Sequence, residues 1–422
     1  MKDEIIAGLD IGSTEIRLVV GQRVKNSGEE EALQIIGGVS VSAEGISKGS
    51  VKSIEDVTSS ISACIEKAER LIGAPIESVW VGINSPNIKC ERSKGVVAVS
   101  KSDGEINQDD IERALEAARA LSVPPNYEIL HVIPISFTID NQENIKDPIG
   151  MTGVRLEVET LIVQGLSSQI KNLTKAIFRT GLQIEDLVIS PLASAEAVIG
   201  AKQKELGAAL VNIGASTTSL AVFEEGELLH TAVIPIGSEH ITSDIAVGLR
   251  CPINLAERVK VEIGNSNPDK FNKKDEIDIS ELVKQEDAEA DLKNISQKYL
   301  AEIIEARVEE IFKKVDNELK KIERSGMLPG GIFLIGGGAK LNGIIEIAKK
   351  ELCLPACIGI NKNVYAVIDK VNEVEFLNAL GLVVWGNQAY GESKGFGTKI
   401  SGKAIFKKVL EKIKKIFSSF VP

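Results

Sequence analysis

A strand–turn–strand pattern that occurs twice, roughly two hundred residues apart, constrains the fold of this chain more than any other feature. Each copy, Ile6–Val20 and Ala208–Phe223, has an apolar strand, a short turn of Gly, Ser and Thr, and a second apolar strand; Asp10 aligns with Asn212. Glycine lets the backbone approach a ligand closely, and turn N–H groups can hold an anion. One copy alone would indicate an ordinary β-hairpin. Two copies predict a duplicated α/β domain whose halves each supply a phosphate-binding loop.

A third glycine-containing turn follows the second hairpin. Gly331–Ile335 is a short apolar strand that enters the triple glycine Gly336–Gly338, and a helical pattern follows. Because a side chain would keep a flat ring away from the backbone, consecutive glycines suit an adenine-binding surface. A triple glycine is weak evidence alone, but its position after the second hairpin makes it a candidate adenine site.

The end of the chain predicts a membrane-surface helix. After a linker rich in Gly and polar residues at 386–402, residues 403–420 place their apolar side chains on one helical face and six lysines with one glutamate on the other, a net charge of +5. A basic amphipathic helix is typical of an anchor that lies on anionic lipid. A core or dimerisation helix is the alternative. The predicted membrane-facing residues are Ile405, Phe406, Val409, Leu410, Ile413, Ile416, Phe417 and Phe420.

Composition excludes several other classes. The net charge of −11 argues against nonspecific nucleic-acid binding. No run of about 18 apolar residues predicts a transmembrane helix, and the N-terminus predicts a strand rather than a signal peptide. Five cysteines without paired spacing favour a reducing compartment. Cys353 and Cys357 are predicted to be small buried residues, and the three histidines are predicted to be structural.

Changes of pattern along the chain predict six parts. Helices interleaved with strands imply sheets covered by helices. The single helix among strands after residue 81 implies a small α+β insertion. That insertion serves either partner contacts or structural elaboration. The predicted parts are a first core at 1–81 and 164–206, the insertion at 82–163, a second core at 207–240 and 325–385, a subdomain at 241–324, the linker at 386–402 and the basic helix at 403–420.

Three helix predictions bear on the site. Small residues in Pro191–Val198 and Phe376–Trp385 suit close helix crossing, which indicates either hinges between lobes or ordinary tight packing. Asn254 is predicted to cap a helix in which Glu257 and Lys260 lie one turn apart. That pair is either a surface ion pair or part of a nucleotide site.

With these residues in view, the chain resembles the FtsA family of actin-like bacterial cell-division proteins over nearly its whole length. The most discriminating segment lies in the insertion, because other actin-like ATPases share the phosphate loops but not that insertion. The resemblance rests on Gly8–Thr14, Ile36–Val39, Leu130–Pro134, Asp140, Pro148–Arg155, His230–Pro235, Thr242–Ala246, Gly336–Ala339 and the basic C-terminal helix.

The resemblance implies a ribonuclease H-like two-lobe fold that binds ATP and Mg²⁺ between its lobes. Asp10 would order the Mg²⁺ shell through water, and Arg307 matches a family arginine that contacts the C-terminal tail of FtsZ. Nucleotide contacts would come from both turns, the Glu257 pair and the glycine turn. They are Asp10, Gly12, Ser13 and Thr14; Asn212, Gly214, Ala215, Ser216 and Thr217; Glu257 and Lys260; and Gly336, Gly337, Gly338, Ala339 and Lys340.

Two departures from the actin-like pattern bear on hydrolysis. Asn212 stands where these ATPases commonly have Asp, and Ala215–Thr217 replaces the usual Gly-Gly-Thr. Losing a carboxylate removes one group that orders Mg²⁺ or attacking water, so we expect ATP binding with at most weak ATPase activity. The terminal helix also lacks the tryptophan common in interfacial anchors.

The resemblance further implies self-assembly into filaments on the cytoplasmic face of the inner membrane at the division site. FtsZ filaments would be held there, and other division proteins would dock on residues 82–163. Two other functions fit the same scaffold. One is a PilM-type adaptor in pilus assembly, which would not need the basic helix. The other is a small-molecule kinase, which needs a carboxylate base beside the γ-phosphate that the sequence does not reveal.

Overall fold

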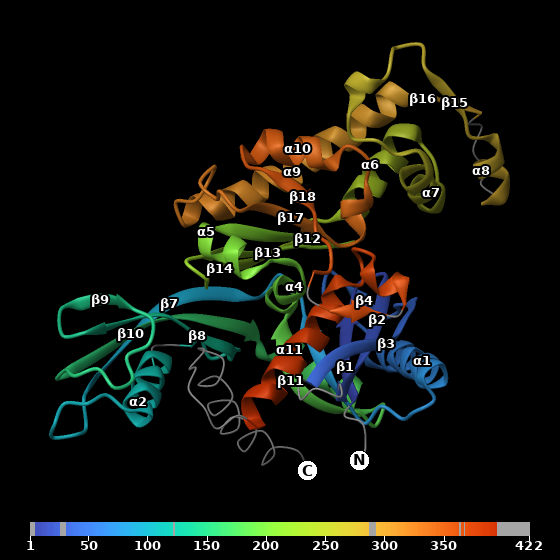
Figure 1. Ribbon diagram of the computed structural model, residues 1–422. Helices are drawn as coiled ribbons and strands as arrows, with labels where there is room; N and C mark the ends of the chain where they lie inside the picture. Colours follow the sequence, from blue (N-terminus) through green and yellow to red (C-terminus); the bar gives the residue numbers. More distant parts are fainter. Residues whose placement is uncertain are drawn as a thin grey trace.

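The computed structural model describes residues 5–25, 31–120, 123–286, 293–362, 364–366 and 368–394. Two sheets form two lobes, drawn one above the other in Figure 1, with a mixed insertion at the lower left and a helical subdomain at the upper right. Across these ranges, no helix is long and apolar enough to cross a membrane. The basic helix predicted at 403–420 lies outside the described residues.

The first lobe is built on a six-stranded sheet of order β11-β6-β1-β2-β3-β19. Strands β1, β2 and β3 run antiparallel, whereas β6 and β11 continue the sheet in parallel. Helix α1 begins at the Ser53 cap, whose hydroxyl accepts from the Asp56 N–H, and it buries an apolar face that includes Val57, Ile61, Ile65 and Ala68. The elements are β1 (Ile5–Ile11), β2 (Glu15–Lys25), β3 (Glu31–Ser42), α1 (Ile54–Ile72), β6 (Ser78–Ile83), α3 (Ser167–Phe178), β11 (Gln183–Ile189) and β19 (Tyr365–Ala366).

The second lobe repeats this plan in a five-stranded sheet of order β14-β13-β12-β17-β18. The β12–β13 hairpin pairs Asn212 with Ser219, as the β1–β2 hairpin pairs Asp10 with Arg17. In both lobes the hairpin has a third antiparallel strand on one side and parallel strands on the other, so the predicted duplication is confirmed. The strands are β12 (Ala208–Ile213), β13 (Thr218–Glu224), β14 (Glu227–Ile234), β17 (Gly331–Ile335) and β18 (Ala356–Ile358).

Two helices cross between the lobes. Helix α4 (Ser190–Val198) follows the first sheet in the chain and packs against β12 and β13 of the second. Helix α11 (Leu377–Lys394) follows the second sheet and packs against β1, β2 and β6 of the first, as well as against α4. Both lie at the junction in Figure 1. The crossing is close, since a Cβ on Gly381 would lie 2.4 Å from the Ala193 carbonyl oxygen. The hinge role stays a prediction.

The predicted linker began too early. Residues 386–394 of the predicted linker belong to α11, and its remaining residues, 395–402, lie outside the described residues. A Cβ on Gly386 would lie 2.6 Å from Trp80 Nε1, so this glycine permits close packing against the first sheet. The guanidinium of Arg23 donates to the Asn387 side chain at 2.8 Å and holds the same turn.

The insertion is a four-stranded sheet of order β7-β10-β8-β9, covered by one helix. Asn107 caps that helix in a reciprocal capping box with Asp110. The small α+β subdomain of the predicted fold class is confirmed, and its strands lie beside the edge strand β14 of the second sheet. Its elements are β7 (Lys89–Ala98), α2 (Gln108–Arg119), β8 (Tyr127–Ile139), β9 (Gln142–Ile145) and β10 (Arg155–Leu166).

The helical subdomain packs α6, α7 and α9 together beyond the second sheet. Its second helix begins at Ile253 after Pro252, so the prediction that Asn254 caps it was wrong by two positions. The elements are α6 (Ser238–Leu249), α7 (Ile253–Ile263), η1 (Pro268–Lys270), β15 (Glu276–Asp278), α8 (Ser280–Gln285), β16 (Asn294–Ser296) and α9 (Gln297–Lys321). The remaining elements are β4 (Ile46–Ser47), β5 (Ser50–Val51), α5 (Ala201–Leu206), η2 (Gly337–Lys340), α10 (Ile344–Leu352) and η3 (Asp369–Asn372).

The cysteine prediction was wrong in one respect. All five cysteines are free thiols, but Cys353 and Cys357 are exposed rather than buried. Cys353 adopts a left-handed backbone conformation, φ 52°, where α10 ends, and this places it at the surface.

His131 is a buried structural histidine that links three parts of the chain. It lies on β8 of the insertion, its Nε2 accepts the Ile189 N–H of β11 at 3.2 Å, and its ring meets Trp385 of α11 edge-on. Burial lowers the pKa of His131 from 6.5 to about 3.

We expect this histidine to make stability fall with acidity. Between pH 6.5 and about 3 the unfolded chain binds a proton at His131 that the folded chain does not. The free energy of unfolding therefore rises with pH across that window, and the stability contributed by the neutral histidine is lost as pH falls through it. The limiting slope is about 1.4 kcal/mol per pH unit. Urea unfolding at several pH values should show a flatter dependence for His131→Gln than for the wild type. His240→Gln is the control and should keep the wild-type slope; parallel curves for all three proteins would contradict the assignment.

Candidate functional site

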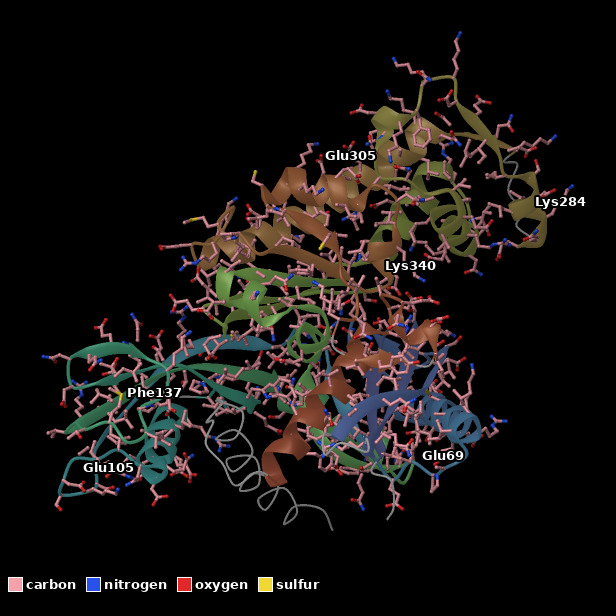
Figure 2. The ribbon with its side chains drawn as sticks, in the orientation of Figure 1. Glu69, Glu105, Phe137, Lys284, Glu305 and Lys340 are labelled. Carbon is pink, nitrogen blue, oxygen red and sulfur yellow. The ribbon has the colours of Figure 1, made fainter. Side chains whose placement is uncertain are left out.

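A cleft of about 490 Å³ lies between the lobes and is lined by both hairpin turns. Figure 2 shows Lys340 at this junction, whereas Glu105 lies in the insertion and Lys284 at the tip of the helical subdomain. Of the nucleotide contacts predicted above, only Ala339 does not line the cleft; it is buried behind the glycine turn. The predicted residues that the structure brings together are Asp10, Gly12, Ser13, Thr14, Asn212, Gly214, Ala215, Ser216, Thr217, Glu257, Lys260, Gly336, Gly337, Gly338 and Lys340.

The two turns have the same local geometry. The Gly12 N–H donates to the Glu15 carbonyl at 3.0 Å, and the Gly214 N–H donates to the Thr217 carbonyl at 2.9 Å. Within the described residues, the backbone N–H groups of the turn residues that follow these glycines, Ser13, Thr14, Ala215 and Ser216, donate to no protein acceptor. Successive free N–H groups in a turn form an anion-binding concavity, so each lobe presents one to the cleft.

Asp10 is the buried carboxylate of the first turn. Only 6 % of its surface is exposed, and this burial raises its pKa, although the nearby Arg17 guanidinium and a hydrogen bond from Asn378 oppose the rise. Arg17 is its cross-strand partner on β2 and itself pairs with Glu15. The first lobe thus places a buried carboxylate beside a cation at the cleft, and Glu15 adds a second carboxylate that pairs with the same cation.

Glu257 and Lys260 form an ion pair at 2.6 Å. Lys260 is only 9 % exposed, and its Nζ also donates to Thr242 Oγ1 at 2.8 Å, so it ties α7 to α6. Glu257 is half-exposed at the cleft wall. The pair is therefore more than a surface ion pair, with the lysine holding the two helices together and the glutamate reaching the cleft.

The glycine turn Gly336–Gly338 forms another wall of the cleft. Gly336 has a left-handed backbone, φ 85°, and a Cβ there would lie 2.3 Å from Asn212 Oδ1. A Cβ on Gly338 would lie 2.4 Å from Ile213 Cγ2, so these two glycines are required by packing. A Cβ on Gly337 would meet nothing within 4 Å and would enter open space. Packing within the protein gives no reason for a glycine at 337, whose bare backbone lines the cleft.

Lys340 closes this wall through two carboxylates. Its Nζ lies 2.6 Å from Glu375 and 3.0 Å from Glu373. Burial would lower the pKa of Lys340, but these hydrogen bonds outweigh it and hold the pKa above its usual value. Lys340 is therefore a fixed charged edge of the cleft.

Several polar residues of the cleft escaped sequence reasoning, among them Glu239, Asn84 and Asn378. Glu239, in the first turn of α6, accepts the Ser216 hydroxyl at 2.6 Å, so a carboxylate does lie beside the second turn. Asn84 donates to Thr217 Oγ1 at 3.2 Å and connects the lobes. Asn378, on α11, contacts Asp10. The signal for Asn378 was present as a lone amide in an otherwise apolar helix start.

Arg307 lies outside the cleft. It is on α9 and donates to Asp244 of α6 at 2.5 and 2.8 Å and to Glu310 at 2.5 Å. Val247, one turn after Asp244, is 79 % exposed. The described part of this surface is thus an anchored arginine near an exposed apolar side chain. The predicted membrane-facing residues lie outside the described residues.

Solved structures share this architecture. A chain of the PilM-PilN type IV pilus biogenesis complex matches with a TM-score of 0.63 at 17% identity, covering 90% of this chain and 98% of that one. MreB5 of Spiroplasma citri bound to AMPPNP matches with a TM-score of 0.54 at 13% identity, covering 93% and 99%. The fold and the cleft between duplicated hairpins define an actin-like protein.

Family models identify the kind of actin-like protein. "SHS2 domain inserted in FTSA" matches residues 86–164, and "Cell division protein FtsA" matches residues 209–381. The chain belongs to the family of cell division protein FtsA. Cell division protein FtsA of Pseudomonas aeruginosa is 34% identical over 95% of this chain and 93% of its own length, and that of Bacillus subtilis is 37% identical over 83% and 77%.

Proposed function

We propose that the cleft binds ATP with Mg²⁺. The observation that supports this most strongly is that two duplicated turns with free N–H groups, one from each lobe, line one cleft whose other wall includes the bare Gly337 backbone. The turns would hold the phosphates from opposite sides, and the adenine would lie on Gly337 near Lys340. The volume of about 490 Å³ is in the ordinary range for a small-molecule pocket. MreB5 of Spiroplasma citri, with the same fold, has been solved with AMPPNP and with ADP.

Magnesium would enter with the phosphates. In the described residues no cluster of three or more His, Cys, Asp or Glu side chains is placed to hold a metal. A Mg²⁺ ion bound to nucleotide phosphates keeps several waters and needs only one or two protein carboxylates. Asp10, buried beside the first turn, suits that role through a water molecule. Asp10 would orient the water shell. Asn212 supplies no carboxylate, and the Glu239 carboxylate beside the second turn is held by the Ser216 hydroxyl, so we expect slow hydrolysis at most.

We further propose that the protein polymerises on the cytoplasmic face of the inner membrane and tethers FtsZ filaments there at the division site. Membership in the cell division protein FtsA family supports this, as does the basic amphipathic sequence at 403–420. Polymerisation would join many weak anchors into firm attachment through avidity. Other division proteins would dock on the insertion at 82–163.

The FtsZ tail would bind near Arg307. The side chain is one quarter exposed and is held by Asp244, so it presents a fixed guanidinium beside the exposed Val247. Asp244 and Glu310 take three of the five guanidinium N–H groups, so the other two remain to donate to a carboxylate of the tail.

Arg307→Glu is expected to weaken binding of a synthetic FtsZ C-terminal peptide by at least about tenfold, since it removes the remaining N–H donors and sets a carboxylate against Asp244 and Glu310. Fluorescence anisotropy with labelled peptide would measure this, and affinity for ATP should not change. Arg258→Glu is the matched control, because Arg258 is an ion-paired arginine of the same subdomain on α7. Equal peptide affinity in wild type and Arg307→Glu would remove this assignment.

The whole function is tested by reconstitution. Anionic vesicles, FtsZ filaments and this protein are mixed with ATP and Mg²⁺, and FtsZ on the vesicles is measured by co-flotation. FtsZ should float only when the full-length protein is present. Absence of FtsZ from the vesicles, despite binding of this protein, would favour an adaptor for another membrane partner. ATP turnover stimulated by a small metabolite would favour the kinase alternative.

A further inference from the structure

The equivalent buried residues of the two hairpins, Asp10 and Asn212, are joined through one side chain, Asn378. Asp10 is the sixth residue of β1, and Asn212 is the fifth residue of β12; both come just before the last residue of their strands. Asn378 is the second residue of α11 and is 8 % exposed. Its Nδ2 donates to Asp10 Oδ2 at 3.3 Å, and its Oδ1 accepts from Asn212 Nδ2 at 3.3 Å. This chain of bonds is called the amide bridge below.

A third contact fixes the amide bridge to the crossing helices. The Ser194 hydroxyl of α4 lies 2.5 Å from Asn378 Oδ1 and 2.7 Å from the Ser190 carbonyl oxygen, and these two acceptors share its single proton. The bridge therefore joins one strand from each lobe with both helices that cross between them. All four side chains are buried, where polar groups cost free energy unless each is hydrogen-bonded.

The amide bridge has a chemical direction. An ionised Asp10 only accepts hydrogen bonds, so Asn378 must present its N–H₂ to Asp10 and its oxygen to Asn212. The residue at 212 must then donate. An amide does so, whereas an aspartate would set its oxygens against Asn378 Oδ1. Asn212, which looked like the loss of a carboxylate, is thus the donor that the bridge requires.

The bridge also reaches the glycine turn. A Cβ on Gly336 would lie only 2.3 Å from Asn212 Oδ1, so the glycine turn packs directly on the same amide. One set of contacts thereby connects the proposed magnesium carboxylate with the wall proposed for adenine.

We propose that Asn378 is a positioning residue that couples the closure of the two lobes to the orientation of Asp10, with Asn212 as its obligatory donor. The proposal rests on the proposed binding of Mg²⁺-ATP in this cleft. Asn378 lines the cleft, and in this proposal it acts on the nucleotide through its hydrogen bond to Asp10. Substitution of Asn378 should therefore change nucleotide affinity mainly when Mg²⁺ is present.

The test is a double-mutant cycle on the full-length protein, read by calorimetric titration of ATP with Mg²⁺ or with EDTA. Asn378→Leu, of similar volume, should weaken Mg²⁺-ATP binding by roughly tenfold and change binding in EDTA by less than about twofold. In an Asp10→Asn background the same substitution should have little further effect, because residues that act as a unit are not additive. Asn378→Ala provides a second route if the leucine does not fold, and melting temperatures report folding for each variant.

Asn387→Asp is the matched control, an asparagine of the same helix that faces Arg23, and should bind ATP as the wild type does. Asn212→Asp should weaken Mg²⁺-ATP binding. Additive effects in the cycle, equal losses with Mg²⁺ and with EDTA, or tighter Mg²⁺-ATP binding by Asn212→Asp would each overturn the proposal for Asn378. Failure of the wild type to bind Mg²⁺-ATP would instead overturn the proposed function.

Discussion

A chain that ends at Gly402 is expected to remain in the supernatant when it is centrifuged with anionic vesicles, whereas the full-length protein should pellet. Residues 403–420 carry six lysines and an apolar face. Each lysine near an anionic surface contributes about 1 kcal/mol, so removing the segment should lower the partition by several orders of magnitude. ATP with Mg²⁺ should increase pelleting of the full-length protein if filaments multiply the anchors.

The controls separate charge from burial. Neutral vesicles should recover much less full-length protein, because the electrostatic attraction is absent. Phe417→Asp should also reduce pelleting, since it places a charge on the apolar face while the lysines remain. Equal pelleting of the shortened and complete chains would move the membrane contact to another part of the molecule, and no pelleting of either would remove the membrane proposal.

Gly337→Val is expected to abolish measurable binding of Mg²⁺-ATP, with a loss of roughly a hundredfold or more, about 2.7 kcal/mol. A Cβ at this position enters open space in the cleft, so the valine would occupy the volume proposed for adenine without a clash inside the protein. The melting temperature without nucleotide should therefore stay near that of the wild type. Titration of ATP and thermal unfolding measure the two effects separately.

Gly338→Val supplies the contrast from the adjacent residue. A Cβ there would lie 2.4 Å from Ile213 Cγ2, and overpacking of this kind typically costs 1–3 kcal/mol. This variant should lose stability as well as nucleotide binding. Normal ATP affinity in Gly337→Val would place the base elsewhere.

The sequence predicted the two sheets because their hairpins repeat one local pattern, and local pattern decides strand, turn and strand. Helix α1 and the helix of the insertion are also decided locally, because in each the cap and the apolar face agree. The sequence missed the amide bridge because Asn378 and Asp10 are 368 positions apart and meet only when α11 returns to the first sheet. Glu239 was missed for a similar reason, since its role depends on the approach of α6 to the second turn.

Helix ends were predicted less well where tertiary contacts override local signals. Glycine and polar residues after Trp385 indicated a linker, yet Asn387 is held by Arg23, and Tyr390 packs edge-on against Trp80. These contacts extend α11 beyond the point where composition alone would end it. Asn254 is a good capping residue by type, but Pro252 fixes a backbone angle suited to the residue before a helix, so α7 begins at Ile253.

The return of α11 to the first lobe has a mechanical consequence. Helix α11 packs on the first lobe and the proposed membrane segment follows it in the chain, whereas Arg307 lies on α9 beyond the second sheet. If a filament were held at α9 and the segment at the membrane, a pull between them would act on the connections between the lobes, which include α4, α11 and the insertion beside β14. Such tension would act on the interface between the two lobes, and the proposed nucleotide site lies at that interface.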